Sequence, residues 1–111
     1  MRVTSSLWVS ALIRRAEAAG AFAMVLHKGA AEAGAIFIVV NDLGDSVALY
    51  GPAPQTDYSM DGPSERQFER VLDAATSDDL KQKIERERSF DPDIWVVEIE
   101  DRQGRSFIES A

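Results

Sequence analysis

The sequence contains no cysteine and a single histidine, His27. The absence of cysteine excludes disulfides, thiolate metal sites and cysteine nucleophiles, and it fits a reducing compartment. A metal site that needs two or more histidines cannot be built from one such chain, and a Ser-His-Asp triad would have to use His27. We therefore predict no metal site and no cofactor.

Long apolar runs are also missing. No stretch approaches the ~20 consecutive apolar residues that a membrane-spanning helix needs. The run from Leu7 to Ile13 is interrupted by Ser10 and ended by Arg14 and Arg15, so it is shorter than the core of a secretory signal. These features predict a cytoplasmic protein without a membrane partner.

Basic residues are outnumbered, with 12 Lys and Arg against 19 Asp and Glu and a net charge of −7. Residues 1–40 hold 4 basic and 2 acidic groups, or +2, whereas residues 41–111 hold 8 and 17, or −9. An acidic surface repels phosphate backbones and anionic lipids. We therefore expect no nucleic-acid partner.

Apolar residues make up 45% of the chain, which is typical of a globular protein, and residues 1–111 fit a single domain. The spacing of Val9, Leu12 and Ala16 predicts a helix that Ser5 or Ser6 caps and that ends near residue 19. Alternating or continuous apolar runs predict strands over 21–28, 35–40 and 46–50. Their short loops favour an antiparallel meander, because parallel crossovers need a dozen or more residues.

The second half predicts two more helices and two more strands. Ser64 and Gln67 match a capping box, and an apolar stripe follows, so we expect a helix over 64–75. A further helix begins at Thr76 or Ser77 and stops before Pro92. Strands are predicted over 94–100 and 105–109, joined by a hairpin turn that contains Gly104.

The predicted class is α+β. It has a single antiparallel sheet of about five strands, an N-terminal helix, and two helices between the third and fourth strands. The order is α-β-β-β-α-α-β-β.

With these residues laid out, the chain resembles a bacterial family catalogued as domain of unknown function 1491. The matching stretches are Trp8–Ala11, Arg14–Arg15, Ala19–Phe22, Gly34–Ile36, Leu49–Gln55 and Phe90–Asp101. The resemblance spans nearly the whole chain and implies a small, single-domain cytoplasmic protein. The resemblance implies no particular activity and identifies no catalytic residue.

Charged side chains offer three candidate sites, each with a plainer interpretation. Arg14 and Arg15 suit an anion or carboxylate, or simply keep a helix soluble. Asp91 and Asp93 suit a hard cation with Glu98, or simply form a turn; Asp93 and Glu98 are roughly 16 Å apart along a strand, which disfavours the cation. Glu98 and Glu100 share one face of a strand and suit acid–base catalysis only if burial separates their pKa values.

The segment 51–62 is a long loop that follows Tyr50 and is stiffened by Pro52 and Pro54. Loops on a rigid scaffold often carry function, although this one can equally drape over the core. His27 suits a nucleophile pair with Ser46 or Ser59, or it is an ordinary polar residue at a strand end. No glycine-rich phosphate loop is present.

No matched set of acid, base and nucleophile emerges, so the sequence favours a non-enzymatic protein-interaction or regulatory module. Such a module would use an exposed strand edge or the loop at 50–63 to bind a protein partner or a second copy of itself. The alternative is a small-molecule or anion binder, or an enzyme. Its site would lie near Arg14, Arg15, Tyr50, Gln55, Asp91 and Asp93.

Overall fold

The structure, a computed structural model, describes residues 3–44, 47–54 and 66–108. Two helices and a five-stranded sheet are formed within those ranges. In chain order the elements are α1 (Ser5–Ala18), β1 (Phe22–His27), β2 (Ile36–Asn41), β3 (Val47–Pro52), β4 (Phe68–Ala75), α2 (Ser77–Phe90) and β5 (Trp95–Glu100).

The sheet is mixed, with the strand order β1-β5-β2-β3-β4. β5 lies between β1 and β2, antiparallel to the first and parallel to the second. β2–β3 and β3–β4 are antiparallel neighbours. The α+β class is confirmed, but a purely antiparallel sheet with β1, β2 and β3 as consecutive neighbours is wrong. Neighbours in the chain need not be neighbours in the sheet, and here the last strand separates the first two.

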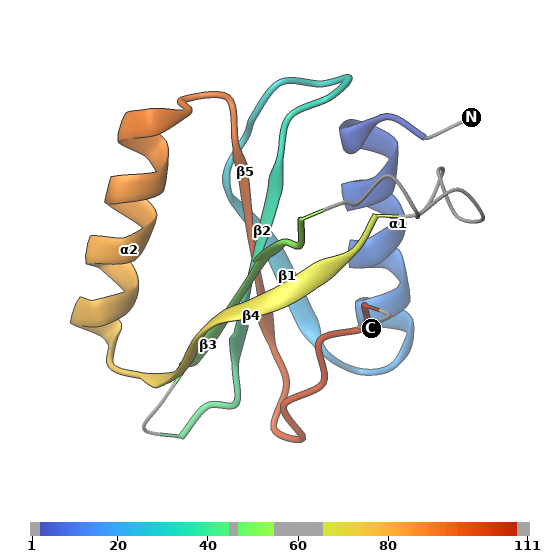
Figure 1. The fold of residues 1–111 in the computed structure, drawn as a ribbon. Helices are drawn as coiled ribbons and strands as arrows, with labels where there is room; N and C mark the ends of the chain where they lie inside the picture. The colour runs from blue at the N-terminus through green and yellow to red at the C-terminus, as the bar shows by residue number, and fades with distance from the viewer. Residues whose placement is uncertain (1–2, 45–46, 55–65, 109–111) are drawn as a thin grey trace.

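Helices cover both faces of the sheet, α1 on one side and α2 on the other (Figure 1). Two separate cores result, because alternate residues of the central strands point to opposite faces. The α1 side buries Val9, Leu12 and Ala16 of the helix against the sheet. The α2 side is smaller and has only Leu80 and Ile84 of the helix packed against it, both partly exposed.

Helix α1 begins one residue earlier than its serines suggest. Thr4 is the N-cap, and its hydroxyl accepts a hydrogen bond from the amide of Leu7 at 3.2 Å. Ser5, which the sequence offers as a cap, is instead fully buried and donates to the carbonyl of Gly34 at 2.6 Å. The predicted helical stripe is confirmed, whereas the predicted cap is wrong.

The segment predicted as a helix over 64–75 is strand β4 from Phe68 onward, and residues 64–65 lie outside the described part. Leu49 opposes Leu72 and the adjacent Tyr50 opposes Arg70, so Val71 is the extra residue of a bulge. A bulge breaks the two-residue alternation of side chains. The apolar residues of β4 therefore recur with a spacing that imitates a helix.

The predicted strand over 105–109 is also wrong, because the described residues 105–108 form no strand. Phe107 has φ of 60°, a left-handed conformation that extended backbone does not contain. The turn is instead closed by Asp101, whose carboxylate accepts hydrogen bonds from Nε and Nη2 of Arg105, both at 2.9 Å. These bonds lower the pKa of Asp101 to about 2 from an ordinary value of 3.8.

The helix predicted from Thr76 or Ser77 is confirmed as α2. Thr76 and Asp79 form a reciprocal capping box, and Asp78 adds a second carboxylate to the positive first turn. No helix among the described residues is long and apolar enough to cross a membrane.

Candidate functional site

The outer strand β1 carries much of the exposed apolar surface. Among the described residues, half of the exposed large apolar side chains belong to this one strand, which indicates clustering rather than scatter. The four are Phe22, Val25, Met24 and Leu26.

Phe22 and Met24 lie on the α2 side of the sheet. Met24 opposes Glu98 and Phe22 opposes Glu100 in the antiparallel ladder with β5, and directly opposed residues share a face. Val96, two residues before Glu98 on the same face, is packed into the core on the α2 side. The apolar pair and the carboxylate pair are therefore neighbours on one surface.

Leu26 is the next exposed apolar residue after Val25, near the end of β1. The register shifts between Val25 and His27, so Leu26 is the extra residue of a bulge. His27 is held in place because its Nδ1 lies 2.9 Å from the carbonyl oxygen of Ile94. Phe22, Met24 and Leu26 are 52%, 41% and 49% exposed.

We call Phe22, Met24, Leu26, Glu98 and Glu100 the open face. Helix α2 packs chiefly on β3 and β4, at the other end of the strand order from β1. The side of the sheet that α2 occupies is therefore covered mainly at the β3–β4 end, and β1 lies at the other end.

The carboxylates of the open face are half-buried rather than fully solvated. Loss of water around Glu98 raises its pKa, and the negative charge of Glu100 raises it further. A hydrogen bond from the side chain of Asn41 opposes this rise. The two acids lie on an inner strand of the sheet, not on the outer edge where they would discourage aggregation.

A second polar cluster lies on the opposite edge strand, β4. The phenol oxygen of Tyr50 accepts hydrogen bonds from Nε and Nη2 of Arg70 at 3.2 and 2.5 Å. Nη1 of the same guanidinium bridges to Asp73 at 3.0 Å. Arg70 also stacks on the ring of Tyr50, with its central carbon 5.1 Å from the ring centroid. All three nitrogens of the Arg70 guanidinium are thus paired within the chain.

The residues of the alternative small-molecule site lie in different parts of the fold. Arg14 is exposed on α1, and Nη2 of Arg15 donates to the carbonyl of Phe107 at 3.2 Å, beyond the end of β5. Asp91 accepts a hydrogen bond from the amide of Asp93 just before β5 begins. The arginine Arg15 and these two acids are therefore at opposite ends of β5.

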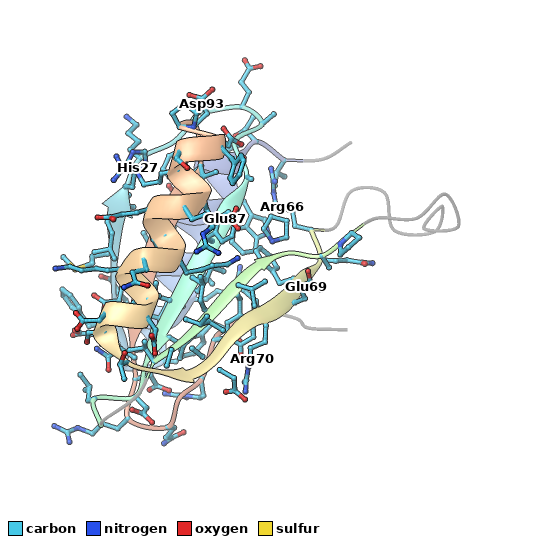
Figure 2. The ribbon with its side chains drawn as sticks, turned by 60° about the vertical axis from the view of Figure 1, so that its left-hand side comes forward. His27, Arg66, Glu69, Arg70, Glu87 and Asp93 are labelled. Atoms are coloured by element: carbon cyan, nitrogen blue, oxygen red, sulfur yellow. The ribbon has the colours of Figure 1, made fainter. Side chains whose placement is uncertain are left out.

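Figure 2 shows Asp93 at one end of the molecule, well separated from Arg70, which contacts Tyr50. Gln55 lies outside the described residues. A single site that combines these groups stays a prediction.

Two further candidate sites from the sequence are a nucleophile pair with His27 and a metal site. Ser46 and Ser59, the nucleophiles considered beside His27, lie outside the described part of the chain. Among the described residues, no group of three or more His, Cys, Asp or Glu is arranged to hold a metal ion.

Two cavities indent the surface near β4. One of about 220 Å³ lies between the end of β3 and the start of β4, beside Pro52 and Phe68. The other, of about 440 Å³, lies between β4 and α2, beside Leu72 and Lys83. Neither includes a residue of the open face or of the alternative site.

Sequence reasoning foresaw an exposed strand edge but did not identify which strand supplies it. A signal was present, since both alternating positions of residues 22–26 are apolar. That pattern suits a strand covered on both sides. Its location at an edge, which only the strand order reveals, leaves one side uncovered.

Comparison with known families gives a match over residues 3–109 to the model described as "Protein of unknown function (DUF1491)". A crystal structure of a DUF1491 family protein from Caulobacter crescentus is 39% identical, covers 100% of this chain and 99% of its own, and superposes with a TM-score of 0.82. The solution structure of protein Atu0922 from A. tumefaciens is 44% identical, covers 97% and 93%, and gives 0.85. Comparison with curated proteins finds no match.

Proposed function

Because the chain belongs to the DUF1491 family, whose description assigns no activity, we propose its role from its surface: a non-enzymatic protein-interaction or regulatory module of the cytoplasm. The observation that carries this proposal is the open face. Phe22, Met24 and Leu26 stand together on an edge strand, each between 41% and 52% exposed. Contiguous apolar surface on a folded domain is typical of protein-binding sites.

The strand is a suitable binding element because, within the described part of the chain, no other strand pairs with its outer edge. Natural edge strands are commonly protected by charges, prolines or coverage. Residues 22–26 contain neither a charged residue nor a proline. A partner that covers β1 supplies the missing protection, which gives the exposed side chains a purpose other than packing within the chain.

Site-specific cross-linking in cells tests the proposal. A photoreactive amino acid replaces Met24 on the open face, and in a second variant it replaces Leu7, which is 64% exposed on α1 and serves as the matched control. We expect a discrete cross-linked protein at position 24 and none at position 7. Adding Phe22→Thr to the first variant should remove the product.

The proposal would be overturned by equal products at both positions, or by none at position 24. A product that persists unchanged with Phe22→Thr would also contradict it, because the open face would then not determine binding. Circular dichroism of each variant confirms that the fold is retained.

A further inference from the structure

The two carboxylates of the open face lack a cationic partner within the described residues. The ion pairs formed there join Arg70 to Asp73, Lys83 to Glu87 and Arg105 to Asp101. None of these pairs includes Glu98 or Glu100. Two negative charges are therefore held near each other beside apolar side chains, with one amide hydrogen bond from Asn41 to offset them.

This arrangement is electrostatically unfavourable in the free protein. Glu98 and Glu100 are two residues apart on the same side of a strand, roughly 7 Å at the usual rise. Partial removal of water from Glu98 is the main cause of its raised pKa, and the negative charge of Glu100 raises it further. A cation brought by a partner relieves both the repulsion and the lost hydration.

The width of the open face indicates the shape of the partner. Neighbouring strands are about 4.8 Å apart and a helix with its side chains is about 10 Å across, so one helix spans two strands. Helix α2 lies in this way over β3 and β4. A helix beside it can cover β1 and β5 together. A strand added to the edge of β1 would instead leave Glu98 and Glu100 uncovered.

Building on the proposed function, we propose that the partner of the open face presents a basic amphipathic helix. Its apolar side chains lie on Phe22, Met24 and Leu26, and its Lys or Arg residues pair with Glu98 and Glu100. A second copy of this chain fits less well, because each copy carries a net charge of −7 and would add acids to an acidic surface.

Nuclear magnetic resonance titration with two synthetic peptides tests this inference. Both peptides are helices of roughly 15 residues with the same leucine stripe, a length at which isolated helices become stable in water. One carries lysines beside the stripe and the other carries glutamines there. The isotope-labelled chain should show shifts centred on residues 22–26 and 98–100 with both peptides, and roughly tenfold tighter binding of the lysine peptide.

A charge-matched pair of variants separates pairing from general attraction. Glu98→Gln with Glu100→Gln should remove the tenfold preference for lysine. Glu17→Gln with Glu32→Gln removes the same charge from exposed positions on α1 and a loop, and should keep that preference. Substituting Gln keeps the shape of each side chain, so both double variants are expected to fold.

Three results overturn the inference. If both peptides bind the open face equally, the partner is apolar but not basic, and the proposed interaction role survives. If the free chain forms a dimer that Phe22→Thr dissolves, a second copy is the occupant. If the shifts map away from the open face, the surface assigned under the proposed function fails as well.

Discussion

At the residue scale, Gly29 sits where the loop before β2 crosses the start of β5. A Cβ on Gly29 would overlap the carbonyl oxygen of Asp93 and the backbone of Ile94. The next residue uses the same contact, since the amide of Ala30 donates to that carbonyl at 2.9 Å. The glycine is therefore required by close approach of two backbones, not by an unusual φ.

Gly29→Ala should lower the free energy of unfolding by about 3 kcal/mol, because neither backbone can move without breaking the contact. Gly20→Ala is the control: Gly20 has φ of 92° but no atom within 4 Å of a Cβ, so it should cost only about 1 kcal/mol of strain. Urea unfolding measures both. A Gly29→Ala cost no greater than that of Gly20→Ala would contradict the packing argument.

Asp101 makes stability depend on acid pH. Its hydrogen bonds with Arg105 lower its folded-state pKa to about 2, so the carboxylate stabilises the fold above its ordinary pKa of 3.8. That stabilisation should fade as pH falls from about 4 toward 2. Asp101→Asn should be less stable than the parent at neutral pH, and the difference should shrink over that acid range.

Urea unfolding at a series of pH values measures this effect. Glu85→Gln, an exposed carboxylate on α2, is the control for loss of one negative charge. A constant difference in stability between the parent and Asp101→Asn from pH 7 to about 2 would count against the prediction.

At the scale of the elements, α2 is stabilised mainly by its N-terminal capping box and by the apolar contacts of Leu80 and Ile84. None of its 14 residues is buried, so its cap accounts for a larger share of its stability than in a deeply packed helix. The hydroxyl of Thr76 accepts from the amide of Asp79 at 3.2 Å. Such a cap is worth about 1 kcal/mol.

Thr76→Ala should therefore lower the free energy of unfolding by about 1 kcal/mol. Ser89→Ala is the matched control, since Ser89 donates to the carbonyl of Arg86 near the other end and its loss should cost about 0.5 kcal/mol or less. Thermal unfolding followed by circular dichroism compares the two. Equal losses would show that the capping box is not the stabilising feature.

Elements whose apolar residues recur at one regular spacing could be predicted from the sequence. Features that depend on segments distant in the chain could not. The stripe of α1 and the cap of α2 are local, and the structure confirms both. The pattern of β4 predicts a helix because the bulge at Val71 alters the spacing of its apolar residues. The insertion of β5 between β1 and β2 pairs segments that are more than fifty residues apart in the sequence, so no local sequence pattern predicts it.

The candidate site could likewise be predicted only where it depends on local spacing. Glu98 and Glu100 could be placed on one face of a strand from their spacing alone. Their position beside Met24 and Phe22 depends on which strand pairs with β5, so the open face emerges only from the fold.

At the scale of the whole molecule, we expect substitutions on the open face to change the free energy of unfolding much less than substitutions in the core. Ile99 is fully buried in the α1-side core, and Ile99→Ala should cost about 3 kcal/mol. Met24→Thr, a strand-compatible change on the open face, should alter stability by about 0.5 kcal/mol or less. Urea unfolding of both measures the contrast. A large loss with Met24→Thr would mean that the open face serves folding rather than binding.

The place of β5 in the sheet bears on how the chain is made. β1 pairs with β5 alone, while β2, β3 and β4 can form a local hairpin series without it. During synthesis the N-terminal segments emerge from the ribosome first, and strand pairings between distant segments form late. Strand β1 therefore has no hydrogen-bonded neighbour at either edge until residues 95–100 have been translated. Until that pairing forms, β1 is the strand of this sheet that most needs protection by a chaperone.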